Sequence, residues 1–256
     1  MTYANDIVSC LGIYSLRRAA SGYTGPAVQC IRKTDSGYDY SDFKPSQIQS
    51  IPDWSGGARV HVRIWYDQSG NGLDLVQNAL EAQPIIAKDG VLLKRSGRPV
   101  LIQEQDGSLD LDLPASVDSY TVSLIGGASY ITERPTLYEL VMPRTTTRRR
   151  LVTRRDGQWA YLGKKYLDPP IVYGSYTSGL GVHTVRHVGS QINLWHDQHP
   201  TAVVVEDPGA STKLTVLNSD RGSEFGSYMS EFVISADPLK PYEARQLHLL
   251  QRSYLS

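Results

Sequence analysis

Cysteine is scarce in this chain: only Cys10 and Cys30 occur among its 256 residues. Two thiols are too few for the disulfide scaffold of a small secreted protein or the ligand cage of a structural zinc site. Isolated cysteines commonly behave as small buried hydrophobic side chains. We therefore interpret both residues as buried free thiols.

Net charge and long apolar runs are missing as well. The 26 basic residues balance 26 acidic ones, so no general attraction to nucleic acid or to an anionic membrane is expected. No apolar run reaches about 18 residues, the length that would indicate a membrane-spanning helix. The start, Met1–Asp6, has no basic region followed by an apolar core. We therefore expect a protein made and assembled in the cytosol, or one trimmed at its start.

The residues that are present favour a folded all-β protein. Hydrophobic residues make up 40% of the chain and charged residues 20%, which argues against disorder. Apolar and polar residues alternate in short segments such as Val60–Ile64, as they do in half-buried strands. Asp89-Gly90 and Asp156-Gly157 are strong two-residue hairpin turns.

These patterns predict about a dozen short strands and two peripheral helices. The strands are expected at 27–33, 60–64, 84–87, 91–94, 119–126, 151–155, 158–162, 182–188, 192–196, 202–206, 214–218 and 227–235. A short helix is expected early within 6–20, and a C-terminal helix begins at Pro241. We predict an antiparallel jelly-roll sandwich in which residues 1–256 form a single domain.

The segment Ile64–Gly72, with the sequence IWYDQSGNG, is the most distinctive stretch of the chain. An apolar strand ends there in small and polar residues that suit a shaped loop. Asp67 and Asn71 offer oxygen atoms that could bind an ion or a sugar hydroxyl. The structural alternative, which we favour, is that they bind amides of their own loop and fix the strand exit.

Three segments together resemble the catalytic domain of arabinofuranosidase B and related lectin-like domains of phage and bacterial surface proteins. They are 14–37, 64–77 and 226–235 followed by the C-terminal helix, whereas 100–208 does not align. The resemblance implies a concanavalin A-like jelly-roll sandwich. Because those enzymes are secreted and oxidised, it also implies a disulfide between the two cysteines as an alternative to free thiols.

The resemblance further implies a pair of carboxylates, a glutamate nucleophile and an aspartate acid/base, about 5 Å apart in a retaining glycosidase. Asp220 stands at the place that matches the acid/base, although a turn residue that caps its own backbone is the simpler interpretation. Glu133 and Glu139 are the only glutamates in the region of the nucleophile, and neither has the expected neighbours. We therefore expect no catalytic residues, with Asp220 catalytic only if the protein is an enzyme.

Further candidate sites rest on residue type. An arginine cluster suited to oxyanions or to a partner subunit consists of Arg148, Arg149, Arg150, Arg154 and Arg155. The simpler interpretation of this cluster is a solvated hairpin.

Tryptophan rings could stack on sugars. Trp159 and Trp195, expected near hairpin tips, are the candidates for exposed stacking, and Asp67 and Asn71 complete the glycan-binding candidates. Trp65 is expected in the core.

Four histidines, His183, His187, His196 and His199, lie close together in the sequence. Their spacing fixes no set of metal ligands, so we predict neither a metal nor another cofactor.

The sequence leads to a first hypothesis and two alternatives. The first is a non-enzymatic protein of a tailed-bacteriophage virion, in the tail fibre, baseplate or capsid. It would assemble as an oligomer with other virion proteins and bind cell-surface polysaccharide or lipopolysaccharide. The main alternative is an arabinofuranosidase-like glycoside hydrolase that uses Asp220, and a weaker one is a bacterial lectin-like adhesin.

Overall fold

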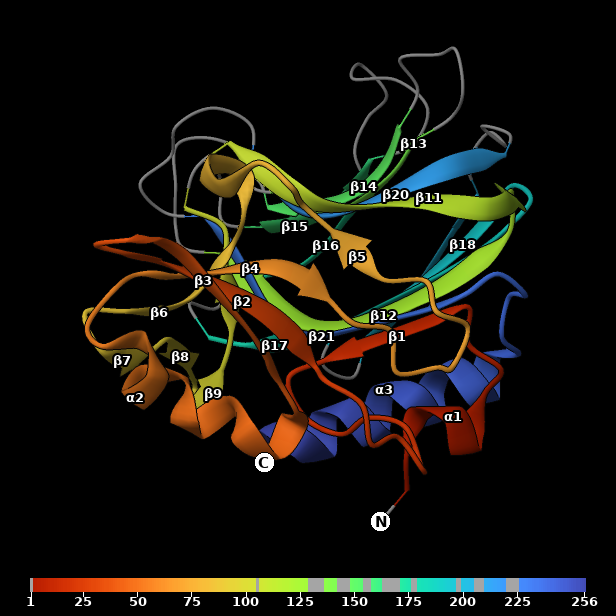
Figure 1. Cartoon of the computed structure of the whole chain (residues 1–256). Coiled ribbons are helices and arrows are strands. Elements are labelled where there is room, and N and C mark those ends of the chain that lie inside the picture. Colours follow the sequence, from red (N-terminus) through yellow and green to blue (C-terminus); the bar gives the residue numbers. More distant parts are fainter. Residues whose placement is uncertain are drawn as a thin grey trace.

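The structure is a computed structural model that consists almost entirely of antiparallel strands (Figure 1). It describes residues 2–104, 106–128, 136–141, 148–153, 158–162, 171–175, 179–196, 199–204, 210–219 and 226–256. Most strands belong to one curled, continuous network of hydrogen bonds. The network folds over into two facing layers, which confirms the predicted all-β sandwich.

The back sheet is the lower layer in Figure 1. Its strands, in spatial order, are β19 (His199–Val204), β18 (Gln191–His196), β17 (Gly181–Val188), β12 (Tyr120–Ala128) and β21 (Ser227–Ser235). Beyond β21, two further strands pair with it: β1 (Gly12–Ser15) and β10 (Leu101–Ile102).

The front sheet is the upper layer. Its strands, in spatial order, are β11 (Gly107–Val117), β20 (Ser211–Ser219), β13 (Thr136–Val141), β14 (Arg148–Thr153), β15 (Gln158–Leu162) and β16 (Ile171–Ser175). We call the side of this sheet that faces away from the back sheet its outer face.

Short strands connect the two layers at one side. They are β4 (Val60–Trp65), β5 (Leu75–Val76) and β6 (Ile85–Lys88), which link β11 of the front sheet to β10 of the back sheet. The hairpin β2 (Val28–Thr34) and β3 (Gly37–Phe43) extends from β4, and β7 (Val91–Leu92) extends from β6. A separate small hairpin consists of β8 (Lys94–Arg95) and β9 (Arg98–Pro99).

The helices lie at the periphery. They are α1 (Ala4–Ile7), the 3-10 helices η1 (Pro45–Ser50) and η2 (Leu80–Ala82), α2 (Ile51–Ser55) and the C-terminal α3 (Pro241–Leu255). Helix α3 runs beneath the back sheet and contacts β12 and β17 (Figure 1). It starts at Pro241, as predicted, because proline suits the first turn of a helix. Among the described residues, no helix has the length and apolar character needed to cross a membrane.

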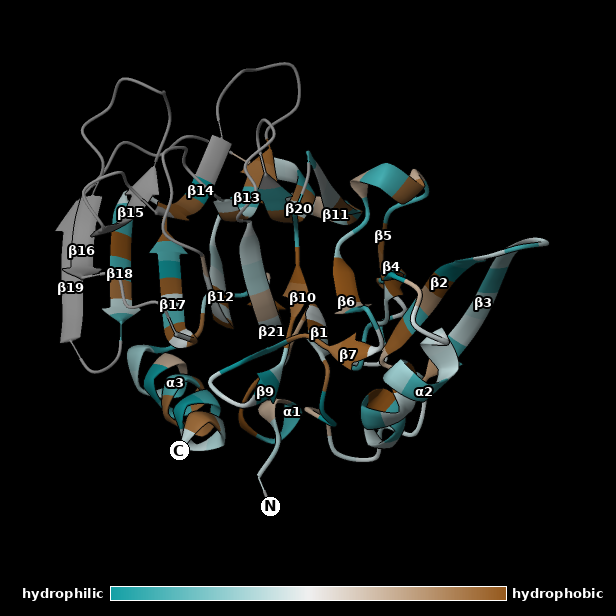
Figure 2. Ribbon diagram, turned by 90° about the vertical axis from the view of Figure 1, so that its left-hand side faces the viewer, coloured by the Kyte–Doolittle hydropathy of each residue, from teal (hydrophilic) through white to brown (hydrophobic). Residues whose placement is uncertain are grey.

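The core fills the space between the two sheets. Tyr138 of the front sheet meets Phe232 of the back sheet with ring centroids 5.8 Å apart. Tyr14 lies 6.2 Å from Phe232 and 6.1 Å from Trp65, which is fully buried as predicted. Figure 2 shows hydrophobic stretches along β2, β6 and β10, whereas hydrophilic and hydrophobic residues are mixed along α3.

The local structure expected from the sequence is found at one hairpin turn and differs at one strand. Asp89 and Gly90 have φ of 53° and 71°, the left-handed conformations that the predicted hairpin turn between β6 and β7 requires. The strand expected at 119–126 is found as β12, but its alternating apolar and polar residues do not give one wet face, because every residue of β12 is buried. The cause is α3, which covers the face of this strand that would otherwise meet water. The Asp156-Gly157 turn lies outside the described residues, although β14 and β15 pair as expected.

Removal of the Phe232 ring should destabilise the whole sandwich. Phe232→Ala deletes a fully buried ring that contacts Tyr14 and Tyr138, so we expect a loss of about 3–5 kcal/mol in the free energy of unfolding. Tyr40→Ala is the matched control, because Tyr40 is 55% exposed on β3, and it should change stability by less than about 0.5 kcal/mol. Urea denaturation measures both. Equal effects of the two variants would show that this core is wrongly placed.

Candidate active site

The distinctive loop after β4 binds its own chain. Asp67 is 5% exposed, and its Oδ1 accepts hydrogen bonds from the backbone N–H of Ile13 at 3.0 Å and of Ser69 at 2.8 Å. Its Oδ2 accepts from the Ser69 hydroxyl at 2.7 Å and from the Leu73 N–H at 3.3 Å. The carboxylate therefore holds β1 against the loop.

Gln68 and Asn71 hold the segment on either side of β1. The Gln68 amide donates to the carbonyl groups of Ser15 and Arg17, while its oxygen accepts from the Ala19 N–H at 2.9 Å. The Asn71 amide donates to the carbonyls of Cys10 and Leu11 at 2.9 Å. These contacts match the structural alternative for the loop, whereas glycan binding by Asp67 and Asn71 stays a prediction.

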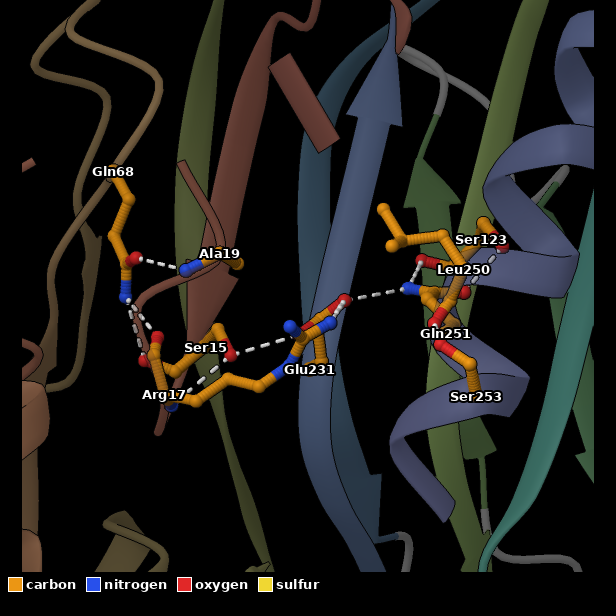
Figure 3. Close-up of polar contacts among 9 residues, drawn as sticks. All are labelled: Ser15, Arg17, Ala19, Gln68, Ser123, Glu231, Leu250, Gln251 and Ser253. Atoms are coloured by element: carbon orange, nitrogen blue, oxygen red, sulfur yellow. Dashed lines mark hydrogen bonds and ion pairs between the residues drawn. The ribbon is translucent and has the colours of Figure 1, made fainter. Parts of the chain in front are cut away.

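A buried carboxylate, Glu231 on β21, continues this network beneath the back sheet (Figure 3). Glu231 is fully buried and accepts from the Ser15 hydroxyl at 2.9 Å and from the Gln251 amide of α3 at 3.2 Å. Arg17 forms an ion pair with it, with its Nε at 2.9 Å from Oε2 and its Nη2 at 3.1 Å from Oε1. These four interactions occupy both carboxylate oxygens, so Glu231 has a structural role.

The network extends across the interface between α3 and the back sheet. The Ser123 hydroxyl of β12 donates to Gln251 at 2.6 Å and lies 2.6 Å from the Thr184 hydroxyl of β17. Thr184 in turn lies 3.1 Å from Nδ1 of His248 on α3. Buried polar groups are costly unless they are bonded, so this set of contacts fixes how α3 sits on the sheet.

A second buried carboxylate lies on the outer face of the front sheet. Glu139 on β13 is 1% exposed, and its neighbours Tyr138 and Leu140 belong to the core between the sheets. Because side chains alternate along a strand, Glu139 points to the opposite side. Its Oε2 lies 3.3 Å from Nε of Arg150, the residue directly across on β14.

Polar residues from the adjacent strands form a row with Glu139. The register pairs Glu139 with Thr215 on β20, and Thr215 with Asp110 on β11. Asp110 accepts from Nζ of Lys213 at 2.7 Å, and both side chains are partly exposed. In this row a carboxylate with a basic partner lies on either side of a buried threonine.

Glu139 was missed as a site by sequence reasoning, although a signal for it exists. It is the only charged residue in the strand Thr136–Val141, whose sequence is TLYELV. A glutamate buried in a strand costs free energy unless it is paired, so such a position is more often functional than an exposed one. Glu133 lies outside the described residues.

The structure describes only some of the remaining predicted site residues. Arg148, Arg149 and Arg150 are consecutive on β14, and Arg150 pairs with Glu139. Arg154, Arg155 and Asp220 lie outside the described residues, although β20 ends at Ser219, directly before Asp220.

The tryptophan candidates differ from expectation at one position. Trp195 is 8% exposed and belongs to an apolar cluster with Leu239 and Leu247. The expectation of an exposed ring is therefore wrong for Trp195, because apolar residues in and just before α3 cover the ring. Trp159 lies on β15, and its contact with glycans stays a prediction.

The histidines do not form a metal site in the described part of the chain, where no group of three or more His, Cys, Asp or Glu could hold an ion. His183 and His196 are buried with their rings stacked at 4.6 Å. Burial, and then the neighbouring His196 and His248, hold the pKa of His183 well below its ordinary value. His183 is therefore an uncharged packing residue at neutral pH.

Both cysteines are free thiols. Burial, and then the charges of Asp67 and Glu231, raise the pKa of Cys10 to about 12. Burial likewise raises the pKa of Cys30, which is fully buried on β2. Neither thiol has the depressed pKa of a reactive cysteine.

No family model and no curated protein sequence matches this chain. Solved structures do resemble it. An arabinofuranosidase complexed with arabinofuranosyl-α-1,2-xylobiose has 13% identity and a TM-score of 0.67, covering 97% of this chain and 64% of that one. A GH54 α-L-arabinofuranosidase soaked with a cyclic sulfate inhibitor has 11% identity and a TM-score of 0.69, with the same coverage of 97% and 64%.

A Trypanosoma rangeli sialidase in complex with sialic acid is more distant. It has 12% identity and a TM-score of 0.55, covering 97% of this chain and 37% of that one. The chain thus spans less than two thirds of the length of the arabinofuranosidases that it matches. At these identities the likeness establishes the fold, a β-sandwich shared with glycoside hydrolases.

These comparisons overturn the prediction of a non-enzymatic virion protein and favour its alternative, a glycoside hydrolase. All three of these similar structures are of glycoside hydrolases. The prediction rested on a missing partner for Asp220, because residues 100–208 did not align with the enzyme family and neither glutamate in the region of the nucleophile had the expected neighbours. The predicted partners and location stay predictions.

Substitutions in the loop separate its structural role from sugar binding. Asp67→Ala leaves buried backbone donors of Ile13, Ser69 and Leu73 without their acceptor, so we expect a loss of about 3 kcal/mol in the free energy of unfolding. Asn71→Ala removes two bonds at an exposed side chain and should cost about 1 kcal/mol. Chemical denaturation gives both values. Unchanged stability with lost glycan binding would instead identify these residues as ligands.

Proposed function

We propose that this chain is a glycoside hydrolase of the arabinofuranosidase kind, with Glu139 as its nucleophile. The observation that carries the proposal is the burial of the Glu139 carboxylate on the outer face of a sandwich whose fold is that of glycoside hydrolases. The fold alone gives no reason to bury a charge in β13. Arg150 offsets that charge and fixes the orientation of the carboxylate.

We assign the acid/base role to Asp220 and not to Asp110, because the resemblance in the sequence places that role at Asp220. Glu139 and Asp110 are separated by β20, so their Cα atoms are about 10 Å apart, or two strand spacings. A retaining pair needs carboxyl groups about 5 Å apart, and Asp110 is already bound by Lys213. Asp220 directly follows β20 and is five residues beyond Thr215, which pairs with Glu139, so its assignment rests on the resemblance and not on the strand register.

In the proposed reaction, a Glu139 oxygen attacks the anomeric carbon of an arabinofuranoside while Asp220 gives its proton to the leaving oxygen. The glycosidic bond breaks and an ester to Glu139 forms. Asp220, now a carboxylate, then takes a proton from a water molecule whose oxygen attacks the anomeric carbon, so that the ester bond to Glu139 breaks, the sugar leaves with a new hydroxyl group and the Glu139 carboxylate is restored. Each carboxyl group thus returns to its starting protonation state.

Two variants test the roles by their dependence on the leaving group. Glu139→Gln should remove turnover of both 4-nitrophenyl α-L-arabinofuranoside and an arabinofuranosyl xylo-oligosaccharide, because no nucleophile is left. Asp220→Asn should lower kcat/KM on the oligosaccharide by about 10²–10⁴. It should lower the rate much less on the nitrophenyl substrate, whose leaving group needs no proton.

The matched control is Asp110→Asn, which makes the same chemical change on the same face and should leave kcat/KM nearly unchanged. Circular dichroism shows whether each variant is folded. Glu139→Asp keeps the charge beside Arg150 but shortens the side chain, so a folded Glu139→Asp without turnover would show lost chemistry and not lost folding. A folded Glu139→Gln with normal rates would contradict the nucleophile assignment. A wild-type chain with no turnover of any arabinofuranoside would contradict the substrate.

A further inference from the structure

A hollow of the molecule lies away from Glu139. It is a groove of about 620 Å³ between the segment that follows β1, the start of η1, the β8–β9 hairpin and the end of α3. Figure 1 places these elements together near the C-terminus, on the opposite side from the front sheet. A volume in the range of about 300–1,000 Å³ is typical of sites for small ligands.

The groove is strongly basic. Its cationic lining residues are Arg17, Arg18, Lys44 and Arg98. None of the described residues that line it is acidic. Glu231 neutralises Arg17 from within the protein. Within the described part of the chain, no ion pair forms at the other three residues, so three positive charges remain uncompensated around one hollow.

Aromatic rings hold the guanidinium groups in place. Arg17 and Arg98 lie over the same ring, that of Tyr254, at 4.5 Å and 4.6 Å from its centroid. Arg18 lies over the Tyr3 ring at 5.1 Å and also donates to the Tyr3 hydroxyl. Side chains that are fixed before binding lose less conformational entropy when a ligand arrives. The arrangement is therefore a prepared cationic site.

The positive charges around this groove repel one another, and an anion bound in the groove would reduce that repulsion. The chain as a whole has no net charge, so the cluster is a local feature and does not reflect composition. Guanidinium groups bind carboxylate, sulfate and phosphate oxygens through paired hydrogen bonds.

We propose that this groove binds a small oxyanion-bearing ligand, a sugar acid or a sugar phosphate or sulfate, through Arg17, Arg98 and the rim residues Arg18 and Lys44. The site is separate from the proposed glycosidase site and does not depend on it. The groove has room for sugar rings as well as for the anionic group. The chain would then hold an acidic saccharide on one side while Glu139 faces another ligand on the opposite side.

Amide chemical-shift mapping of the full chain tests this proposal. The probes are glucuronate, glucose 6-phosphate and inorganic phosphate, with glucose as the uncharged control. We expect saturable shifts at groove residues such as Gly25, Ser46 and Gly97 with the anions and none with glucose. Equal affinity for phosphate alone would assign recognition to the oxyanion, and tighter binding of the sugars would assign it to the whole saccharide.

Two substitutions make the test specific. Arg98→Met removes one charge-assisted contact and should weaken binding at least about tenfold, and Lys44→Met at the exposed rim should weaken it in the same direction. Arg95→Met is the control: Arg95 is on the same hairpin but lies over the Tyr228 ring outside the groove. The proposal fails if none of the anions binds, if glucose shifts the same amides, or if Arg98→Met binds as tightly as Arg95→Met.

Discussion

The packing of α3 and of the N-terminal segment against the back sheet depends on the buried carboxylate of Glu231. It binds Ser15 and Arg17 from the N-terminal segment and Gln251 from the C-terminal helix, all from the middle of β21 (Figure 3). An ionised group without water is tolerated only when it is paired and hydrogen-bonded. Its partners are therefore tied to one another, because this one side chain bonds both to the N-terminal segment and to the C-terminal helix.

The distinctive loop after β4 completes this arrangement from the other side. Gln68 binds the backbone on both sides of Leu16, so the segment Ser15–Ala19 is held between Gln68 and Glu231. That segment presents Arg17 and Arg18 to the basic groove. The loop that marks the fold thus also positions the proposed anion site, although none of its own side chains lines that groove in the described part of the chain.

The two buried glutamates differ in their surroundings, and we propose a catalytic role only for Glu139. Four described donors surround Glu231, which leaves it no capacity to react. Glu139 stands in a row of polar residues on the outer face of the front sheet, beside the strand that leads to Asp220. The likeness to arabinofuranosidases supports the proposal for Glu139, but the fold alone does not establish a reaction.

Local patterns in the sequence were sufficient for much of the fold. The Asp89-Gly90 turn and the proline that opens α3 each act within a few residues, and each is found as predicted. The alternation predicted for Val60–Ile64 is found in part, because Val60 and Val62 are buried whereas Ile64 is only half-buried. The candidate site was harder to predict, because it joins positions that are distant in the sequence: Thr215 pairs with both Glu139 and Asp110. The burial of Trp195 depends likewise on residues that are distant in the sequence, because Leu239 and Leu247 belong to the same apolar cluster.

Covalent trapping tests most directly whether Glu139 is the nucleophile of a glycosidase. A cyclic sulfate of arabinofuranose configuration is opened by an attacking carboxylate, which leaves the sugar attached through an ester. Mass spectrometry of the digested protein would then locate the added mass. We predict a single label on the peptide that contains Glu139, and none in the Glu139→Gln variant. A label on another carboxylate, or an unlabelled protein that still hydrolyses arabinofuranosides, would contradict the assignment.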